Sequence, residues 1–338
     1  MIVPPSPVAE SAARERLAAL AKPTGALGRV EDLAAWLAAC QDTCPPRPPE
    51  RVRLVVLAGD HGVAARGVSA YPTDVTAAMV HAFATGTAAA GVLARQHGVA
   101  LRVLDIAVDA DLAGPPGVGA YKIRRGSGSI DVEDALSEAE LDAALLAGWA
   151  IAREEIAAGA DLLILGDMGI GNTTPGAALI ATTFGLPPAD VVGRGTGIDD
   201  AALARKTAVL EAAVARVGDR ACDPRVRLKA LGSADLATGV GFLIAAAQEG
   251  VPVLLDGLAT LAELSVADEI APGTASWCAA GHRSTEPAQR LALDKLGLVA
   301  VLDLGLRLGE GSGALLALPV LRSAARLTGE MALLTDLV

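Results

Sequence analysis

A carboxylate flanked by glycines stands near the end of the sequence, within residues 307–314. Glu310 lies between Gly309 and Gly311, and the neighbouring Leu308 and Ala314 are apolar. Apolar surroundings remove water from a carboxylate and raise its pKa toward the range in which it can accept a proton at neutral pH. Glu310 is therefore a candidate general base. The alternative is a solvent-exposed glutamate on a turn.

A glycine-rich segment, 166–175, follows an apolar run and precedes an Ala-rich one. Its glycines allow a ligand to approach the backbone, and Asn172, Thr173 and Thr174 can cap a helix whose free N–H groups would hold a phosphate. The alternative is a capped turn without a ligand. The segment lacks the Gly-Lys-Ser/Thr of a Walker A loop, which argues against nucleoside triphosphate hydrolysis by that route.

A second glycine loop, 193–197, leads into two aspartates, which favour the start of a helix because acidic groups are stabilised at a helix N-terminus. Lys206, one or two turns into that helix, can reach an anion, although a solvated lysine is the more common case. His61 and the polar segment 281–287 also follow apolar runs. A histidine at a strand end could be a base or a ligand, but simple hydrogen bonding is its more common role.

These polar residues require elements that hold them together. Six short apolar runs each end in Gly or Asp, several of them before an Ala-rich segment, a pattern typical of a parallel α/β sheet. The runs are nearly continuous, so helices should cover both faces of the sheet, and a ligand should bind at the carboxyl ends of the strands. We expect strands at 52–58, 101–106, 162–165, 251–255, 274–279 and 298–302, and covering helices at 76–96, 138–158, 199–217 and 235–249.

Both ends of the chain have helical periodicity, and a proline-rich connector at 45–49 leads from the first end into the sheet. Pro319 interrupts the pattern near the second end, where we expect a kink or a turn. The expected terminal helices span 11–20, 27–39 and 313–328. The sequence thus predicts a large Rossmann-like α/β domain at 50–312 and a small helical domain made of 1–45 together with 313–338.

The composition limits the possible classes of protein. In the 338 residues 52% are hydrophobic, which excludes a disordered chain. The net charge of -11 has the wrong sign for neutralising DNA or RNA phosphates, and 2% aromatic residues leave no platform for base stacking. The most apolar run, 236–247, is too short to span a membrane, and the first residues lack a secretory leader. We expect a cytoplasmic protein without nucleic-acid or membrane partners.

Four cysteines could in principle bind a metal. Cys40 and Cys44 form a CxxxC pair, but no second Cys or His pair follows it downstream. We therefore expect reduced, mostly structural thiols and no metal.

Taken together and in order, these segments resemble the nicotinate-nucleotide:dimethylbenzimidazole phosphoribosyltransferase family. The resemblance runs from about residue 23 to about residue 331. Each motif alone is a moderate signal, whereas their common order is a strong one. The motifs lie at 23–28, 122–126, 166–174, 193–200, 252–257, 282–287 and 306–313.

The resemblance implies a homodimer that moves the ribose phosphate of nicotinate mononucleotide onto 5,6-dimethylbenzimidazole. The products are α-ribazole 5'-phosphate and nicotinate, and the step belongs to assembly of the lower ligand of cobalamin. It implies Glu310 as the general base, Asp167 as a second catalytic carboxylate nearby and Ser69 at the pocket of the acceptor base. It places the other candidates around the mononucleotide, namely Gly169, Gly171, Asn172, Thr173, Lys206, Arg307 and Gly309.

The chemistry of this reaction suits a site with one base and no cofactor. The leaving group of nicotinate mononucleotide is a pyridinium, which departs without new positive charge, so neither an acid nor a metal is needed on the leaving side. One base must remove the azole N–H proton while the other ring nitrogen attacks the anomeric carbon. Phosphoribosyltransferases that expel diphosphate use Mg²⁺ and an acidic pair followed by Thr-Gly-Gly-Thr, a string that this sequence lacks.

The sequence departs from the family pattern around the acceptor. Asp167 stands where the family has Glu, residues 232–235 replace a Gly-Gly-Phe-Glu run, and Thr73, Asp74 and Ala77 replace Gln or Glu. The acceptor therefore stays open between dimethylbenzimidazole and another benzimidazole, a purine or a phenol. A mononucleotide-binding protein without turnover also stays open. A dinucleotide-dependent oxidoreductase would share the fold, but the chain lacks GxGxxG after the first strand.

Overall fold

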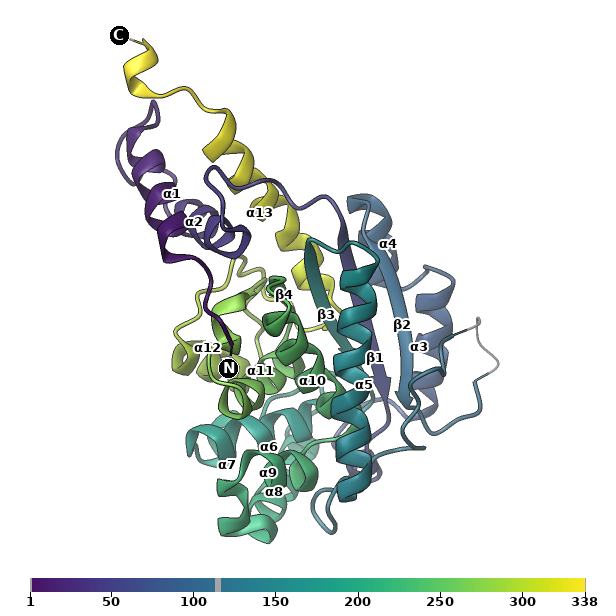
Figure 1. Cartoon of the computed structure of the whole chain (residues 1–338). Coiled ribbons are helices and arrows are strands. Elements are labelled where there is room, and N and C mark those ends of the chain that lie inside the picture. Colours follow the sequence, from purple (N-terminus) through teal and green to yellow (C-terminus); the bar gives the residue numbers. More distant parts are fainter. Residues whose placement is uncertain (1, 113–116, 338) are drawn as a thin grey trace.

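Within residues 2–112 and 117–337, which this computed structural model describes, five parallel strands form one sheet in the order β2, β1, β3, β4, β5 (Figure 1). The strand order reverses between β1 and β3, and a reversal of this kind opens a crevice at the carboxyl ends of the strands. The strands are β1 (Val52–Gly59), β2 (Ala100–Ala107), β3 (Leu162–Met168), β4 (Val253–Leu255) and β5 (Cys278–Ala280). The predicted α/β class is confirmed.

Alternate residues of each strand face two different cores, as the pleat requires. Val55 and Leu57 of β1 pack in one core, and Leu54 and Val56 pack in the other. The first core is covered by α5 (Glu138–Ala157), α6 (Thr173–Phe184), α9 (Pro224–Leu231), α10 (Ala234–Gln248), α11 (Leu258–Ile270) and α12 (Pro287–Leu296). The second is covered by α3 (Asp74–Ala84), α4 (Ala89–His97) and α13 (Ser312–Glu330). Helices on both faces explain the nearly continuous apolar runs of the strands.

The remaining helices surround this centre. α7 (Pro188–Val191) and α8 (Asp200–Val217) pack on α6, and α1 (Pro7–Ala19) and α2 (Arg29–Gln41) lie beside α13. Short 3₁₀ helices occur at Gly62–Arg66, Gly218–Cys222, Thr274–Trp277 and Leu334–Leu337. The predicted helices at 138–158, 199–217 and 235–249 correspond to α5, α8 and α10.

The single helix predicted at 76–96 is wrong, because the chain breaks it into α3 and α4. Gly86 adopts a φ of 70°, and the N–H of Thr87 turns back to the carbonyl of Ala82 at 2.8 Å. Taken whole, Asp74–His97 is long and apolar enough to cross a membrane, with a mean hydropathy of 1.4. The break leaves two helices that pack on β2, each far shorter than the roughly 20 residues of a spanning helix.

Two of the six predicted strands differ from the structure. The run 274–279 begins as a 3₁₀ turn after Gly273, whose φ is 99°, so β5 starts only at Cys278. The run 298–302 is not a strand. It follows the left-handed Gly297 at the end of α12 and makes only an isolated bridge between Leu302 and His282, while Val299 is left exposed.

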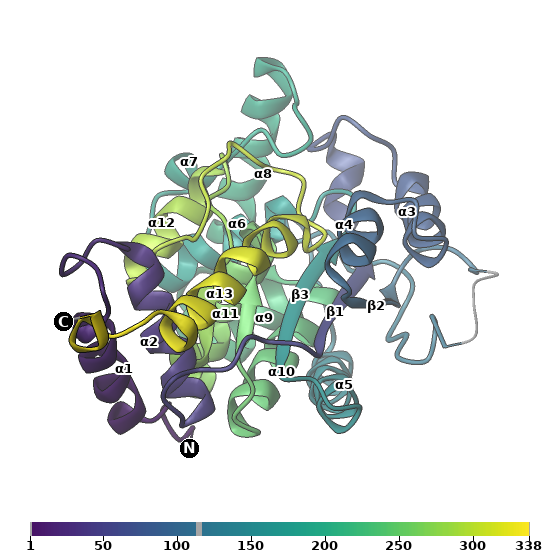
Figure 2. The same cartoon turned by 90° about the horizontal axis from the view of Figure 1, so that it is seen from above.

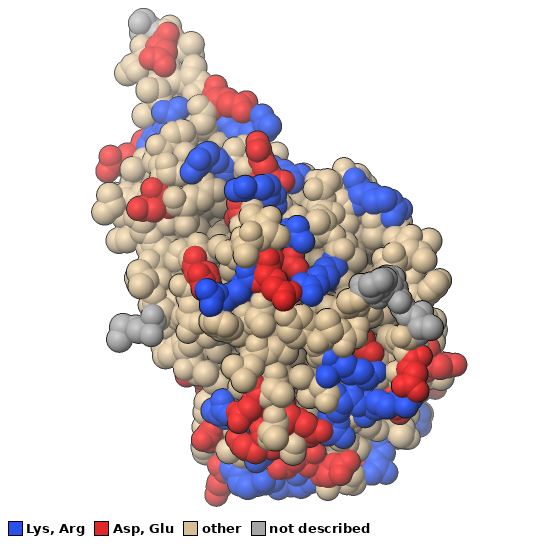
Figure 3. All heavy atoms as spheres, turned by 45° about the vertical axis from the view of Figure 1, so that its right-hand side comes forward, with Lys and Arg blue, Asp and Glu red and all other residues tan. Residues whose placement is uncertain are grey.

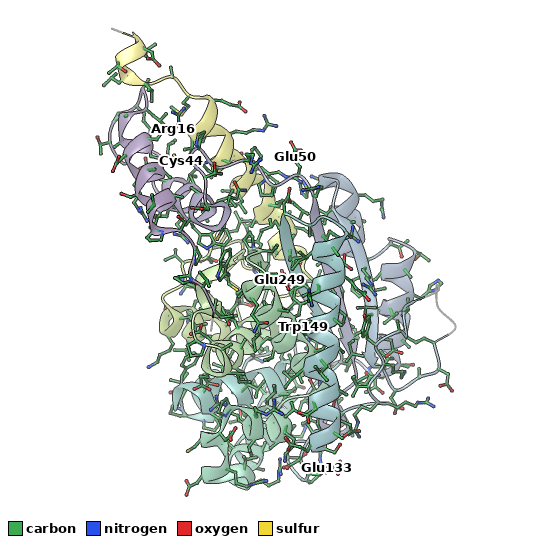
Figure 4. The ribbon with its side chains drawn as sticks, viewed as in Figure 1. Arg16, Cys44, Glu50, Glu133, Trp149 and Glu249 are labelled. Carbon is green, nitrogen blue, oxygen red and sulfur yellow. The ribbon has the colours of Figure 1, made fainter. Side chains whose placement is uncertain are left out.

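The terminal helices lie side by side at one end of the molecule, and Figure 2 shows α13 running from the sheet toward α1 and α2. Arg16 of α1, labelled in Figure 4, donates to the carbonyls of Thr328 (2.6 Å) and Gly329 (3.2 Å) of α13. The start of α13 packs on the sheet and its end packs on α1 and α2. The helix continues through Pro319, so the expected turn is wrong and a kink at this residue stays a prediction. The small domain at 1–45 and 313–338 stays a prediction, with Met1 and Val338 outside the described residues.

The surface carries both signs of charge close together. On the face shown in Figure 3, acidic and basic side chains lie beside one another. Arg216 pairs with Asp134 at 2.6 Å, and Arg102 pairs with Glu154 at 2.8 Å. Paired charges of this kind do not form the extended basic surface that binding to nucleic acid requires.

Candidate active site

A cavity of about 450 Å³ opens at the carboxyl ends of β1 and β3. Its walls come from the loop after β1, the turn between β3 and α6, the second glycine loop and the loop before α13. A narrow extension of about 60 Å³ continues toward the ends of β4 and β5. Both parts are lined by Asp167, Asn172, Thr173, Arg307, Leu308 and Glu310, so they form one site.

The structure brings all ten predicted site residues together. Glu310, Asp167, Ser69, Gly169, Gly171, Asn172, Thr173, Arg307 and Gly309 line the cavity or its extension. Lys206 does not line the cavity, but its ammonium group reaches Thr173 from behind.

Glu310 is the buried carboxylate of this site. Glu310 is 4% exposed, and its Oε2 has no hydrogen-bond partner within the described part of the chain. Burial, and secondarily the charge of Asp256, raises the pKa of Glu310 to about 7. A group with this pKa is partly ionised at neutral pH and can accept a proton from a bound ligand.

The backbone around Glu310 is unusual. Glu310 has a φ of 68°, and Gly309 and Gly311 have φ values of 79° and 85°. These three consecutive residues form a tight turn in the left-handed region, a backbone conformation that residues with a Cβ rarely adopt. The turn lies against β3, since a Cβ added to Gly166 would be 2.7 Å from the carbonyl carbon of Glu310. The backbone of this turn therefore packs directly on β3.

Lys206 of α8 is the cation that contacts the turn at the start of α6. It is 1% exposed, and its Nζ donates to the Oγ1 of Thr173 (2.7 Å) and to the carbonyl of Gly193 (3.1 Å). Burial lowers the pKa of Lys206 to about 8, although the charge of Glu286 opposes the shift. The ammonium group is therefore held at the point where the two glycine loops meet.

Glu286 and Arg307 hold the second glycine loop in place. The Oε1 of Glu286 accepts the N–H of Gly195 at 2.8 Å, and the Nη1 of Arg307 donates to the carbonyl of Gly195 at 2.6 Å. Gly195 has a φ of 47° and lies close to both Thr173 and Lys206. The guanidinium thus borders the cavity while its position is fixed by a backbone carbonyl.

The N-terminus of α6 faces the same region. The sequence suggested that Asn172 could cap this helix, but no side chain caps it. The Nδ2 of Asn172 donates instead to the Oδ1 of Asp167 at 2.6 Å, and Thr173 is engaged by Lys206. The N–H of Thr174 donates to the carbonyl of Gly171 at 3.0 Å and Pro175 has no N–H, so it is mainly the dipole of α6 that favours an anion at this end.

Asp167 belongs to a buried group of charges behind the cavity. His61 and Asp235 are 3% and 0% exposed, and the Nε2 of His61 lies 3.3 Å from the Oδ2 of Asp235. Burial opposes charge on both groups, but each stabilises the other, so the pKa of His61 is raised and that of Asp235 is lowered. Burial and the charge of Asp235 raise the pKa of Asp167 well above its usual range. Ionisation of Asp167 is therefore disfavoured beside the Asp235 carboxylate.

The opposite wall of the cavity is mostly apolar and could receive a flat ring. Val68, Val75, Met79 and Met168 line it. The Oγ1 of Thr196 accepts the N–H of Ala70 at 2.9 Å and lies 3.2 Å from the Oγ of Ser69. Thr196 thus connects the glycine loop to the loop that carries this wall.

Another cavity, of about 560 Å³, lies between the terminal helices and the segment around β5 and α12. Its charged side chains pair with one another, as Arg14 does with Glu10 (2.9 Å) and Asp32 (3.3 Å). Among the residues that line it, none is a buried carboxylate with a raised pKa. We therefore place the chemistry in the cavity around Glu310.

Reasoning from the sequence did not assign a role to Asp235, Asp256 or Glu286, which all contact the site residues. Asp256 stands directly after an apolar run, Glu286 stands in the polar segment 281–287 that follows another, and both lie inside motifs that carry the family resemblance; this position is the signal that could have identified them. Across residues 2–112 and 117–337, no group of three or more His, Cys, Asp or Glu side chains is arranged to hold a metal ion, and the four cysteines are free.

Comparisons with known proteins agree over nearly the whole chain. A family model described as phosphoribosyltransferase matches residues 2–336. The nicotinate-nucleotide–dimethylbenzimidazole phosphoribosyltransferase of Mycobacterium avium strain 104 is 55% identical over 333 residues, covering 98% of this chain and 95% of that protein. The protein of the same name from Mycobacterium tuberculosis strain H37Rv is 54% identical over 332 residues, covering 98% and 92%. The crystal structure of CobT from Thermus thermophilus superposes with a TM-score of 0.94 at 43% identity and covers 98% of both chains.

Proposed function

The chain belongs to the nicotinate-nucleotide–dimethylbenzimidazole phosphoribosyltransferase family, and we propose that its cavity transfers the phosphoribosyl group of nicotinate mononucleotide to 5,6-dimethylbenzimidazole. The products are α-ribazole 5'-phosphate and nicotinate, for assembly of the lower ligand of cobalamin. One observation carries the residue-level proposal: a buried carboxylate, Glu310, shares a cavity with an anion site made of a helix N-terminus, Arg307 and the nearby Lys206.

The mononucleotide phosphate binds where the two glycine loops meet. The N-terminus of α6 and the guanidinium of Arg307 border this point, and Lys206 supplies positive charge through its position behind Thr173. A doubly charged phosphate is favoured by the helix dipole and by charge-assisted hydrogen bonds. Gly309 leaves room for the ribose beside the backbone, whereas Gly169 is needed because an added Cβ would lie 1.9 Å from the carbonyl oxygen of Gly59.

The acceptor ring lies between the apolar wall and Glu310, with Ser69 at its edge. Glu310 takes the N–H proton of the azole, the other ring nitrogen bonds to the anomeric carbon, and the bond from that carbon to the pyridinium nitrogen breaks. The electron pair of the broken bond returns to the pyridine ring, which leaves as nicotinate. Asp167, whose pKa burial and the charge of Asp235 raise well above its usual range, accepts the amide of Asn172 and contributes a polar wall of the cavity.

We also propose that two copies form a homodimer and that the enzyme acts in the cytoplasm, as expected for a biosynthetic enzyme that uses a soluble nucleotide. Exposed apolar side chains such as Leu146 and Trp149 on α5, the latter labelled in Figure 4, are compatible with association of two copies. Light scattering after gel filtration tests the proposal: a mass of twice 33.9 kDa supports it, and a mass of 33.9 kDa contradicts it.

The experiment for the activity is product analysis by mass spectrometry. The purified protein receives nicotinate mononucleotide with dimethylbenzimidazole, benzimidazole, adenine or a phenol, in parallel reactions with and without EDTA. We expect α-ribazole 5'-phosphate and nicotinate in equal amounts with dimethylbenzimidazole. Faster turnover of another acceptor would change the proposed substrate but not the reaction. Absence of nicotinate release with every acceptor would indicate a binding protein, and loss of the rate only in EDTA would overturn the metal-free mechanism.

A further inference from the structure

Asp256, the residue after β4, caps a helix from a distant part of the chain. It is 1% exposed, and its Oδ2 accepts the N–H of Gly311 at 2.9 Å. Its Oδ1 accepts the N–H groups of Gly313 (2.8 Å) and Ala314 (3.1 Å). The N-cap residue of α13 is Gly311, which has no side chain to satisfy these donors. Asp256 therefore supplies the cap that the local sequence lacks.

The capped turn is the one that carries Glu310. Glu310 has a φ of 68°, a conformation that costs free energy for a residue with a Cβ and persists only where its surroundings enforce it. On one side the N–H and Oγ of Ser312 bond the carbonyl of Gly309 at 3.0 and 2.6 Å. On the other side Asp256 binds Gly311. The two anchors fix the direction in which the Glu310 carboxylate leaves the backbone.

Asp256 is itself held in place by buried side chains. The Nε2 of His282, which is 1% exposed, lies 3.5 Å from the Oδ1 of Asp256. Gln289 donates to the carbonyls of Asp256 (3.3 Å) and His282 (2.9 Å). Gly313 allows this arrangement, since an added Cβ would lie 2.0 Å from the ring of His282. The carboxylate therefore has little freedom to move away from the turn.

We propose that Asp256 is a positioning residue for the transfer reaction: it fixes the turn that carries Glu310 and places a second negative charge beside the Glu310 carboxylate. The inference rests on the proposed function of Glu310 as the base. In this role Asp256 does more than stabilise α13. A neutral cap of the same size would hold the turn less firmly and would not repel negative charge on Glu310.

The charge of Asp256 and its capping of α13 have separate effects on Glu310. The titratable and charged groups that face Glu310 are Asp256 after β4, Asp167 on β3, His282 after β5, Glu286 before α12 and Arg307 on its own loop. After burial, the charge of Asp256 is the contribution that raises the pKa of Glu310 to about 7. If this charge acts on Glu310, its removal lowers the pKa of Glu310. If Asp256 only caps α13, its removal leaves that pKa unchanged.

The test measures kcat against pH in Asp256→Asn, Asp256→Glu and the wild type. Asn keeps the size but not the charge, so we expect a lower kcat and an acid limb that moves down by about half a pH unit or more. Glu keeps the charge and displaces the turn, so we expect a lower kcat with the limb in place. Asp303→Asn, an exposed aspartate of the 301–307 loop, is the matched control and should change neither.

An acid limb that stays at its wild-type position in Asp256→Asn overturns the electrostatic role, and wild-type kcat in both variants overturns the positioning role. If Asp256→Asn does not fold, Asp256→Glu still decides the positioning role. Titration of Glu310 by ¹³C NMR, with the Glu310→Gln spectrum as the assignment, gives a readout that does not depend on turnover. A wild-type protein without transferase activity would refute the proposed function, whereas an unshifted Glu310 titration in Asp256→Asn would refute this inference alone.

Discussion

The imidazole Nε2 of His61 lies 3.3 Å from the Oδ2 of Asp235, and both side chains are shielded from solvent. The pair places one positive and one negative charge directly behind Asp167. Two adjacent buried carboxylates disfavour each other's ionisation, and the contact with His61 favours the charge on Asp235, so the pKa of Asp235 is lowered and that of Asp167 is raised. The charge of the reaction cavity is thereby set by groups that do not line it.

Asp235→Asn should destabilise the protein by about 3 kcal/mol at pH 7, because it leaves His61 buried without its counter-charge. The lowered pKa of Asp235 means that its stabilising contribution is present above the unfolded pKa and is lost as the pH falls through the folded pKa. The raised pKa of His61 means that its contribution is complete below the unfolded value and is lost as the pH rises through the folded one. Urea unfolding measures the difference in free energy of unfolding between Asp235→Asn and the wild type. Asp219→Asn, at an exposed position, is the control. Equal stability of Asp235→Asn and wild type would show that the pair is not charged.

Asp167→Asn should keep kcat within about tenfold of the wild-type value, because Asn resembles a protonated Asp in shape and charge and can still accept the hydrogen bond of Asn172. The acid limb of the kcat profile should not move to higher pH. Steady-state assays from pH 5 to pH 9 provide the comparison, roughly two units on either side of the pKa of Glu310. A loss as large as that in Glu310→Gln would mean that Asp167 acts as an ionised base.

Lys206→Met should weaken binding of nicotinate mononucleotide by about 1 to 3 kcal/mol, since it removes a buried positive charge beside the phosphate site. The wild-type affinity should itself decrease as the pH rises through the lowered pKa of about 8, because the ammonium group loses its charge there. Calorimetry at pH 7 and pH 9 tests both statements. Lys295→Met, an exposed lysine on α12, is the matched control. Unchanged affinity in Lys206→Met would place the phosphate elsewhere.

Thr196→Val should raise the KM of the acceptor about three- to tenfold, because it removes the hydroxyl that accepts the N–H of Ala70 and contacts Ser69. Thr196→Ser keeps that hydroxyl and should behave like the wild type. Affinity for the mononucleotide, measured by calorimetry without acceptor, should change little in either variant. Identical acceptor KM values for Val and Ser would show that the link between the two loops does not shape the acceptor pocket.

The sequence predicted the central strands of the sheet better than the segments near its β5 edge. Continuous apolar runs identify buried parallel strands wherever both faces are covered, as at β1 and β3. The run 298–302 has the same composition, but it follows the end of α12 with Val299 exposed, a tertiary relation that local composition does not encode. Likewise Gly86 divides the helix predicted at 76–96 through its positive φ, although the apolar residues on either side continue the pattern.

The residues of the candidate site were predictable from the sequence, but the contacts among them were not. Local reasoning attributed the apolar environment of Glu310 to Leu308 and Ala314, yet Leu308 is 55% exposed. The turn that carries the buried Glu310 is held instead by the contact with Gly166 on β3 and by the cap from Asp256. The pairing of His61 with Asp235 is a similar case, since the two residues come from opposite halves of the chain. Only the folded sheet brings such residues together.

The central claim is that Glu310 removes the acceptor proton, and the kcat of Glu310→Gln at saturating substrates tests it most directly. Gln keeps the shape and a hydrogen-bond acceptor, so mononucleotide affinity by calorimetry should be unchanged. Wild-type kcat should rise with pH through the pKa of about 7, and the assay is therefore made at pH 8, above that limb. We predict a kcat lowered by about 10² to 10⁴. A kcat within about threefold of the wild-type value would contradict the assignment of Glu310 as the base.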